Sequence, residues 1–531
     1  MNKKLFILLL VFLFFKQLIW VSLVPLWHFP DEQAHFAQVA YLGEMGTQPG
    51  KTPFDLTEEI RISENLLGTE RDNSGNNRFT FHPEYKIEYA PVLYGIYEEK
   101  INKLAKDPIL RQMKKNEASH YPPIYYFVIS LVYRVFYYKD LIIRVFLSRI
   151  IQLIFYLGTV FLTYKIGKMI FKSSLETLTL IILVAFHPMF SFVGSGVNSD
   201  NIGNFSFSLF IYFSLVLLKD SINVKNTLGL LLITLLAIFI KPQNYISVPV
   251  TLMLIIYKLF ESKIAFNIKT KILSVFTVLF VIFLIFLSKT NNAIFILLTK
   301  FFDEFSFTQF YRQFVHFALP QFYREALPWY WGIFDWLGVT YPRIVHRIIN
   351  WSILASTAGF LIYMVKNFKK INRWPINGVI FLLLLNLLFF IGVYQFDYVQ
   401  YVASGYNFHL GVQGRYFFPL IISHMLFIVI GIKELFRFFP KLVGYSIKIL
   451  ASLMILLHWY AIYTIVKTYY DYSSLYSFII QASQYKPWFF KGIYLVILII
   501  AALTANLIFL IKYLKYKNVY DKSNTKQSFA H

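Results

Sequence analysis

Near its start the chain carries a long apolar run, residues 5–26, LFILLLVFLFFKQLIWVSLVPL, followed directly by the polar residues 27–38, WHFPDEQAHFAQ. A helix needs about 20 apolar residues to cross the hydrocarbon core of a bilayer. No small-x-small cleavage site follows the run, so we expect a retained signal anchor with a cytoplasmic N-terminus. This stretch predicts a membrane protein and sets the orientation of the segments that follow.

The composition agrees with that interpretation. Of 531 residues, 57% are hydrophobic and only 15% are charged, more apolar surface than one soluble core would bury. The formal net charge of +23 would suggest nucleic acid for a soluble protein, but here we assign it to membrane topology and expect no nucleic-acid partner. The chain has no cysteine, which excludes disulfides, thiolate metal sites and cysteine nucleophiles.

Further apolar runs predict an all-α membrane protein with about twelve spanning helices. Lysine and arginine clusters fall on alternate connections, for example Lys165, Lys168 and Lys172. The positive-inside bias places these clusters and both termini in the cytoplasm of a multi-pass plasma-membrane protein. After the first, the predicted spans lie at residues 147–164, 177–195, 202–218, 227–240, 245–260, 272–288, 345–365, 376–395, 416–432, 446–466 and 492–511.

Two long connections are predicted on the outer side. One is a first loop, 27–146, and the other an amphipathic loop, 289–344. Residues 122–138 are apolar enough to count as a span, but a crossing there would invert every later loop, so we expect an interfacial helix whose tyrosines suit the headgroup region. The segments are 1–26 (first span), 27–146 (outer loop), 147–288 (spans 2–7), 289–344 (outer loop), 345–511 (spans 8–12) and 512–531 (basic tail).

Polar and ionisable residues gather at the predicted outer ends of the spans. All of these ends face one compartment, so the pattern predicts a mixed-charge site at the outer leaflet, above a bundle buried in hydrocarbon. The residues are Asp31, Glu32 and His35 after the first span, Asn198, Asp200 and Asn201 after the third, Lys241, Gln243 and Asn244 after the fifth, and Arg415 at the start of the tenth.

The group after the first span is the strongest candidate for chemistry. Pro30 favours a helix start, and Asp31, His35 and Gln38 then share one helix face. A carboxylate there can accept a proton from an incoming hydroxyl. Alternatively, Asp31 only caps the helix and Glu32 is solvated.

The order of motifs resembles the GT-C superfamily of integral-membrane glycosyltransferases, and within it a bacterial branch whose activity is not established. A GT-C enzyme takes a sugar from a polyprenyl-phosphate carrier on the outer face of the membrane. The resemblance covers nearly the whole chain. Its motifs are Pro30-Asp-Glu-x-x-His35, His120-Tyr-Pro-Pro-Ile-Tyr-Tyr126, Arg149, Val197-Asn-Ser-Asp200, Lys241-Pro242, Trp331-Gly-Ile-Phe-Asp-Trp336 and Gln413-Gly-Arg-Tyr416.

The resemblance implies an inverting transferase in which Asp31 is the catalytic carboxylate. Asp200 would be the second acidic residue, holding the acceptor or a metal. The remaining implied site residues bind substrate, the cations by neutralising the carrier phosphate; they are Arg149, Lys241 and Arg415, with Glu32, His35 and Tyr416. The implied partners are a polyprenyl-phosphate-linked sugar, a glycan, glycolipid or protein acceptor, and membrane lipids.

Each assignment has a simpler alternative. Arg149 and Arg415 would anchor span ends among lipid headgroups, Asp200 would be a turn residue bonded to its own backbone, and the tryptophans around Trp331 would form an interface belt. A divalent cation, Mg²⁺ or Mn²⁺, held by Asp31, Glu32, His35 and Asp200 is left open.

Two other functions remain as alternatives. An outer-face polysaccharide polymerase or ligase would also act on polyprenyl-linked glycans, but would use arginine and histidine in later loops. A lipid-linked glycan transporter would need polar residues along a path through the midplane and two related halves, and neither is evident in the sequence.

Overall fold

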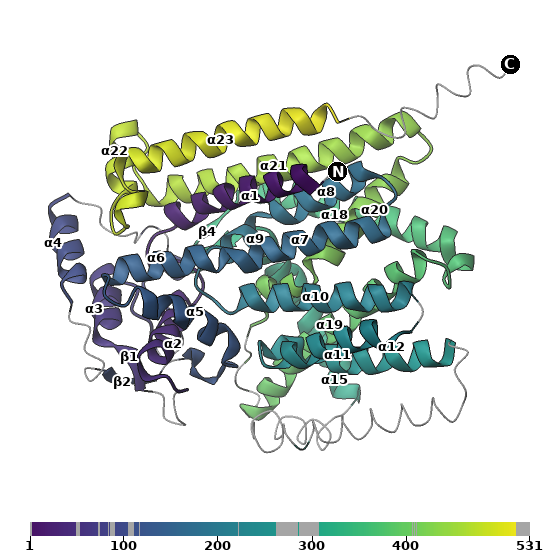
Figure 1. Ribbon diagram of the computed structural model, residues 1–531, viewed down its shortest axis with the longest axis horizontal. Helices are drawn as coiled ribbons and strands as arrows, with labels where there is room; N and C mark the ends of the chain where they lie inside the picture. Colours follow the sequence, from purple (N-terminus) through teal and green to yellow (C-terminus); the bar gives the residue numbers. More distant parts are fainter. Residues whose placement is uncertain are drawn as a thin grey trace.

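In the computed structural model the long helices run side by side along the length of the molecule (Figure 1). The structure describes residues 3–48, 54–72, 75–82, 91–104, 111–115, 117–220, 222–261, 307–405 and 411–516, with the single residues 84, 285, 407 and 409. Within these ranges, eight helices are long and apolar enough to cross a membrane. They are Phe6–Leu23, Leu141–Ile170, Asp200–Lys219, Arg343–Lys370, Ile376–Val402, Gly414–Leu435, Leu442–Tyr469 and Gly492–Leu514.

These eight helices overlap eight of the predicted spans, so the protein is a largely helical membrane protein, as predicted. The predicted spans 177–195, 227–240 and 245–260 fall on shorter helices. The predicted span 272–288 lies outside the described residues. The total of about twelve therefore stays a prediction.

Two boundaries differ from the sequence prediction because of helix caps. The second span begins at Leu141, not at 147, because the Asp140 carboxylate caps it by accepting a hydrogen bond from the Ile143 amide. The predicted span 177–195 is broken, because Pro188 starts a new helix capped by the side chain of His187. The helices concerned are α6 (Leu141–Ile151), α7 (Leu153–Ile170), α8 (Ser174–Ala185) and α9 (Pro188–Val193).

The first loop folds into a small layer at the left end of the bundle in Figure 1. Its two strands pair antiparallel, with Phe54 opposite Lys115 and Thr57 opposite Arg111. The helices and strands of the loop are α2 (Glu32–Met45), β1 (Phe54–Thr57), α3 (Glu58–Leu67), α4 (Pro91–Asn102), β2 (Arg111–Lys115), η2 (Glu117–His120) and α5 (Ile124–Val135).

Helix α5 occupies the segment predicted to lie in the membrane interface. It has 12 residues, too few to cross a bilayer, which takes about 20. The tyrosines within α5, which were predicted to suit the headgroup region, are turned into the protein, whereas Tyr138 beyond its end is exposed. Tyr126 and Tyr133 are buried, whereas Phe127 and Leu131 are exposed. Packing against α2 explains the difference, because Tyr133 makes an edge-to-face contact with the Phe36 ring of that helix.

A buried ion pair fastens this layer to the bundle. Arg144 of α6 binds both carboxylate oxygens of Glu59 of α3, at 2.9 and 2.6 Å, and also donates to the Tyr133 hydroxyl at 2.6 Å. A bidentate arginine–carboxylate pair fixes orientation as well as distance. Helix α6 thus holds the first loop in one position above the spans.

The rest of the described residues form the spans and their connections. Helix ends rich in lysine gather at one end of the bundle, where Lys258 donates to the Leu218 carbonyl and Lys448 to the Leu514 carbonyl. The compartment that this basic end faces stays a prediction. The remaining elements are α1 (Lys3–Leu23), α10 (Asp200–Lys219), α11 (Val224–Ile238), η3 (Pro242–Ile246), α12 (Ser247–Glu261), α15 (Phe307–Gln313), η4 (Phe314–Ala318), α16 (Leu319–Gln321), η5 (Phe322–Ala326), α17 (Leu327–Gly332), β3 (Ile333–Phe334), β4 (Val339–Thr340), α18 (Arg343–Asn367), η6 (Phe368–Lys370), α19 (Ile376–Ala403), η7 (Gly414–Leu420), α20 (Ile421–Leu435), α21 (Pro440–Tyr469), α22 (Leu475–Ala482), η8 (Trp488–Phe490) and α23 (Gly492–Leu514).

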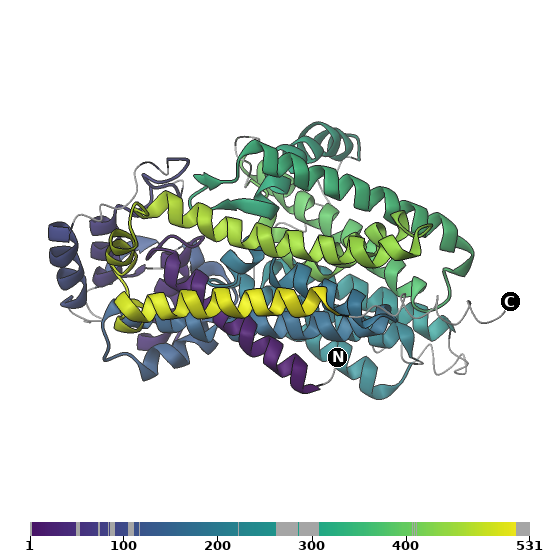
Figure 2. The same cartoon turned by 90° about the horizontal axis from the view of Figure 1, so that it is seen from above.

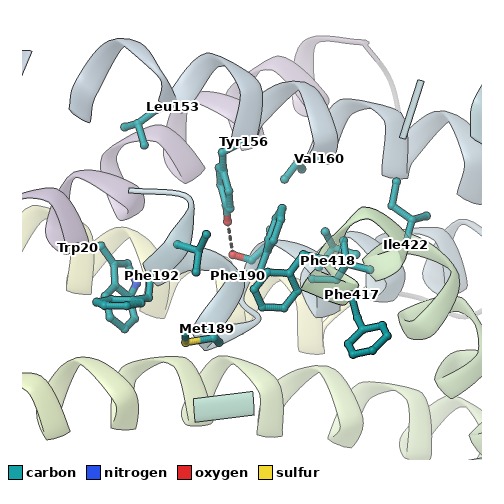
Figure 3. Packing of buried hydrophobic residues seen from close by; sticks show 14 of the residues in the cluster. Trp20, Leu153, Tyr156, Val160, Met189, Phe190, Phe192, Phe417, Phe418 and Ile422 are labelled. Atoms are coloured by element: carbon teal, nitrogen blue, oxygen red, sulfur yellow. Dashed lines mark hydrogen bonds between the residues drawn. The ribbon is translucent and has the colours of Figure 1, made fainter. Parts of the chain in front are cut away.

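Aromatic side chains fill the centre of the bundle (Figure 3). Phe190 of α9 lies between Tyr156 of α7 and Phe418 of η7, with ring centroids 5.3 and 5.5 Å apart. Elsewhere helices touch through their backbones. A Cβ on Gly431 of α20 would lie 1.9 Å from the Ser356 carbonyl oxygen of α18, so only glycine fits there.

Candidate active site at one end of the bundle

Asp31 lies at the N-cap of α2 in a left-handed conformation, with φ 54° and ψ 22°. Such a conformation costs a non-glycine residue about 1–3 kcal/mol and tends to occur at functional sites. Its side chain makes no capping hydrogen bond to the described residues of α2, which argues against the simple capping alternative. The carboxylate instead accepts a hydrogen bond from Arg415 at 2.5 Å, and the Asp31 side chain is 38% exposed.

A second carboxylate, Asp200, begins α10. Its backbone amide donates to Asn198 Oδ1, while its carboxylate contacts the ammonium group of Lys241. The structure therefore does not show the predicted alternative of a turn residue bonded to its own backbone. The other carboxylate oxygen lies 3.7 Å from Arg415 Nη1. Arg415 thus links the two carboxylates.

Arg415 is held in place by its neighbours in η7. Gln413 Oε1 accepts a hydrogen bond from Arg415 Nε at 2.6 Å, and the guanidinium carbon lies 5.8 Å from the centre of the Tyr416 ring. Gly414 brings the backbone against α17, since a Cβ there would lie 2.1 Å from the Tyr330 amide nitrogen. The arginine is therefore positioned by close packing.

The structure brings together four residues that are distant in sequence, which we call the Arg415 cluster: Asp31, Asp200, Lys241 and Arg415. They come from the start of α2, the start of α10, the connection before η3 and the start of η7. The N-terminal end of α10 lies beside α5 and the first-loop layer in Figure 1. This is the convergence that the glycosyltransferase hypothesis requires.

Electrostatics keep Asp31 charged and His35 neutral. Burial alone would raise the pKa of Asp31, but Arg415, with smaller contributions from Arg71 and His35, holds it well below its usual range. Burial lowers the pKa of His35 to about 3; Asp31 opposes this shift, and Lys241 and Arg415 add to it. The neutral imidazole bonds to the Tyr126 hydroxyl through Nδ1 at 2.8 Å.

The neighbouring carboxylate, Glu32, has a different environment. It is fully buried, so the predicted alternative of a solvated Glu32 is wrong. Arg149 binds its two oxygens at 2.8 and 2.6 Å and uses its remaining donors on the carbonyls of Val21, Val24 and Pro25. We call Glu32 and Arg149 the Arg149 pair. Substrate binding by either residue stays a prediction, and these contacts fit a positioning role.

The location of Arg149 also differs from the prediction. It was expected to open the second span, but that span begins at Leu141 and places Arg149 inside α6, with no side-chain exposure. It is therefore not a headgroup anchor. The pair connects α1, α2 and α6, and Glu32 also accepts a hydrogen bond from the Val197 amide, in the segment that leads to Asp200.

An acid–histidine contact near the site was not predicted from the sequence. His28 Nδ1 lies 2.8 Å from Asp335 Oδ1, and both side chains are buried. Burial raises the pKa of Asp335, and His28 opposes that shift. Asp335 lies in the turn between β3 and β4, inside the Trp331–Trp336 motif, and was not predicted as a site residue. Trp336 donates to the Trp27 carbonyl at 3.3 Å and so connects this turn to the segment before Asp31.

A family described as "Predicted membrane protein (DUF2142)" matches residues 13–424. The chain belongs to this family. No curated protein and no solved structure matches it. The range matched by the DUF2142 family contains all four residues of the Arg415 cluster and both residues of the Arg149 pair.

The side chains suggested as ligands for Mg²⁺ or Mn²⁺ in this DUF2142 member do not fit a shared site. Asp31 and Asp200 face Arg415 and Lys241, Glu32 is bound by Arg149, and His35 bonds to a tyrosine. Over the residues that the structure describes, no group of three or more histidine, aspartate or glutamate side chains could hold a metal.

Proposed function

We propose that this protein is an inverting membrane glycosyltransferase that moves a sugar from a polyprenyl-phosphate donor to a glycan, glycolipid or protein acceptor on the outer face of the membrane. The observation that carries the proposal is the Arg415 cluster, in which a partly exposed carboxylate lies beside two cations. Such a transfer needs a group that accepts a proton and positive charge for the departing phosphate. The cluster contains both.

Asp31 is the proton acceptor in this scheme. An acceptor hydroxyl gives its proton to the Asp31 carboxylate as its oxygen attacks the anomeric carbon. The bond from that carbon to the carrier phosphate breaks, and its electron pair leaves with the phosphate oxygen. Arg415 and Lys241 neutralise the developing charge. A single displacement from the opposite side inverts the anomeric configuration.

The ion pairs explain how donor binding would activate the base. In the structure Arg415 is occupied by Asp31, and Lys241 by Asp200. A phosphate that binds both cations competes with these carboxylates. Asp31 then loses the contact that depresses its pKa and becomes a better base. The donor itself thereby switches on the residue that deprotonates the acceptor.

Buried polar groups deeper in the bundle do not favour the transporter alternative. Lys16, in the middle of α1, donates to the Tyr156 hydroxyl at 3.0 Å and to Ser191 Oγ at 3.1 Å. Gln17 donates to Ser195 Oγ at 2.7 Å. These groups bind one another across the break between α8 and α9, which indicates that they stabilise that break.

Surface glycans provide the test. Mass spectrometry would compare cells that carry the chain, cells that lack it, and cells that carry Asp31→Asn or Asp72→Asn. Asp72 is an exposed aspartate of the same loop and serves as the control. We expect one sugar unit to be missing without the chain and with Asp31→Asn, and to be restored by Asp72→Asn. Identical glycans in all strains would refute the proposal.

A further inference from the structure

At the end of the bundle opposite the Arg415 cluster lies a cavity of about 800 Å³ between α1, α7, α8 and α23. Its rim includes Lys219, the last residue of α10, whose first residue is Asp200. A helix of 20 residues is about 30 Å long, so the cavity is remote from the candidate active site. Its volume lies in the range of about 300–1,000 Å³ that is usual for ligand sites.

The wall and the rim of the cavity differ in chemistry. Leu9 and Phe12 of α1 form an apolar wall together with Ile508 and Phe509 of α23, and the Phe12 and Phe509 rings stack with their centroids 5.3 Å apart. These two helices cross at an angle in Figure 2 and diverge towards the N-terminus of α1 and the C-terminus of α23. Helix α23 is the least buried of the eight candidate spans, at 17%. The apolar part of the cavity therefore suits a hydrocarbon chain.

Positive charge surrounds the opening. The exposed lysines on the rim are Lys168, Lys172, Lys219 and Lys512. Within the described part of the chain none of the four forms an ion pair, and none of the described residues that line the cavity is acidic. Hence no acidic side chain of the rim competes for an anion.

The N-terminus of α8 adds to the positive potential at the opening of the cavity. Ser173, on the rim, caps α8 by accepting a hydrogen bond from the Leu175 amide, and the positive end of the helix dipole points to the opening. Glu176, in the first turn of α8, is buried and pairs with Lys433 at 2.9 Å, away from the cavity lining.

We propose that this cavity binds one phospholipid with an anionic headgroup, with an acyl chain against the apolar wall formed by α1 and α23 and its phosphate at Lys168, Lys172 and Lys512. A free phosphate would use the lysines but not the apolar wall, so the combination selects a lipid. Basic pockets between spanning helices on the cytoplasmic side are suited to anionic headgroups. The charge pattern predicts that this end faces the cytoplasm, where anionic lipid is available.

The bound lipid would stabilise the fold by linkage, because it binds the packed helices and not the unfolded chain. Helix α1 is the element most affected, since it lines the cavity at one end and leads to Asp31 at the other. This inference does not depend on the proposed function, because it rests on a separate cavity.

Titration of the purified full chain with phosphatidylglycerol, followed by native mass spectrometry and thermal unfolding, tests the proposal. Phosphatidylcholine with the same acyl chains is the lipid control. The double variant Lys168→Gln/Lys172→Gln should bind phosphatidylglycerol about 25-fold more weakly, taking about fivefold for each lysine. The matched variant Lys369→Gln/Lys370→Gln removes two exposed lysines of η6 outside the cavity and should bind as the wild type does.

A second variant tests the apolar part. Ala505→Trp places a large side chain in the cavity without changing charge and should also weaken phosphatidylglycerol binding. An equal loss of phosphatidylglycerol affinity in Lys168→Gln/Lys172→Gln and in Lys369→Gln/Lys370→Gln would indicate nonspecific electrostatic attraction to the surface. That result would overturn the proposal. Unchanged binding by Ala505→Trp would likewise overturn it. So would competition by glycerol phosphate at the concentration at which phosphatidylglycerol binds, because the headgroup alone would then account for recognition.

Discussion

Two adjacent carboxylates, Asp31 and Glu32, belong to regions with opposite properties. In the Arg149 pair every donor of the guanidinium is bonded, both oxygens of Glu32 are bound, and neither side chain is exposed. In the Arg415 cluster the side chain of Asp31 is 38% exposed to solvent, and Arg415 contacts both Asp31 and Asp200. The polar groups of the Arg149 pair are fully satisfied, whereas Asp31 of the Arg415 cluster stays accessible to water.

The comparison shows how one segment serves both stability and chemistry. A buried ion pair with all its hydrogen bonds made is strongly destabilising to break, because the remaining charge has no access to water. A partly exposed pair contributes little to stability and exchanges partners readily. The Arg149 pair thus fixes the backbone at Glu32, and the left-handed Asp31 next to it presents its side chain to Arg415.

The largest expected effect is that of Arg149→Ala. Removing the guanidinium leaves Glu32 as an uncompensated buried charge, which costs about 3–5 kcal/mol, a large share of the stability of a typical protein. We expect little monodisperse protein in size-exclusion chromatography and a much lower temperature of unfolding. Arg415→Ala is the matched variant, because water can reach Asp31 when its partner is removed. Equal instability of the two variants would contradict the distinction between the regions.

The second largest expected effect is a loss of turnover when the charge of Asp31 is removed, compared with removal of the charge of Glu32. Asp31→Asn removes the proton acceptor and should lower the transfer rate about 10²–10⁴-fold with a nearly unchanged unfolding temperature. Glu32→Gln should have the opposite pattern. Its unfolding temperature should fall clearly, and the transfer rate per folded molecule should change much less than in Asp31→Asn. Rates are compared after correction for folded protein. A folded Asp31→Asn variant with wild-type turnover would remove Asp31 from the mechanism.

The sequence could predict much of this arrangement, because hydropathy and charge act locally. The eight long spans and the gathering of Asp31, Asp200, Lys241 and Arg415 follow from apolar runs and from the side on which each run ends. The alternation of lysine clusters likewise predicted the basic end of the bundle. These predictions stay correct even when the predicted helix boundaries are wrong by several residues.

Structural features that depend on single contacts could not be predicted from the sequence. Asp31 and Glu32 are equivalent in sequence, and only the three-dimensional positions of Arg149 and Arg415 distinguish them. The burial of Arg149 depends on a helix that starts at Leu141, a shift of six residues from the prediction. The contact of His28 with Asp335 joins residues 307 positions apart, and no local pattern reports such a pairing.

Lys241→Ala should have a smaller effect, mainly on donor binding. The variant loses one charge-assisted contact to phosphate, worth about 1.5–3 kcal/mol, so the KM for the donor should rise about tenfold or more. Stability should also fall, because the pair of Asp200 with Lys241 is buried, but less than in Arg149→Ala, because Asp200 stays 3.7 Å from Arg415. Steady-state kinetics at varied donor concentration would measure the change. A fall in kcat with unchanged KM would contradict a role in donor binding.

The smallest expected effect is a pH dependence of stability from His35, whose pKa is influenced by Asp31, Lys241 and Arg415 of the Arg415 cluster. The pKa of His35 falls from 6.5 to about 3 on folding, so between these values the unfolded chain binds a proton that the folded protein does not. Stability is therefore lost as the pH falls below 6.5. For this one group the loss between pH 6.5 and 5.5 is about 1 kcal/mol. The depressed pKa of Asp31 acts only at more acid pH.

The measurement compares unfolding of the wild type and His35→Gln at pH 7.5, 6.5 and 5.5. Other buried histidines titrate in both proteins and cancel in the difference. We expect the wild type to lose about 1 kcal/mol more than the variant between pH 6.5 and 5.5. Parallel curves would mean that His35 is protonated in the folded protein. Its charge would then add to those of Lys241 and Arg415, and the cluster would carry one more cation for a phosphate.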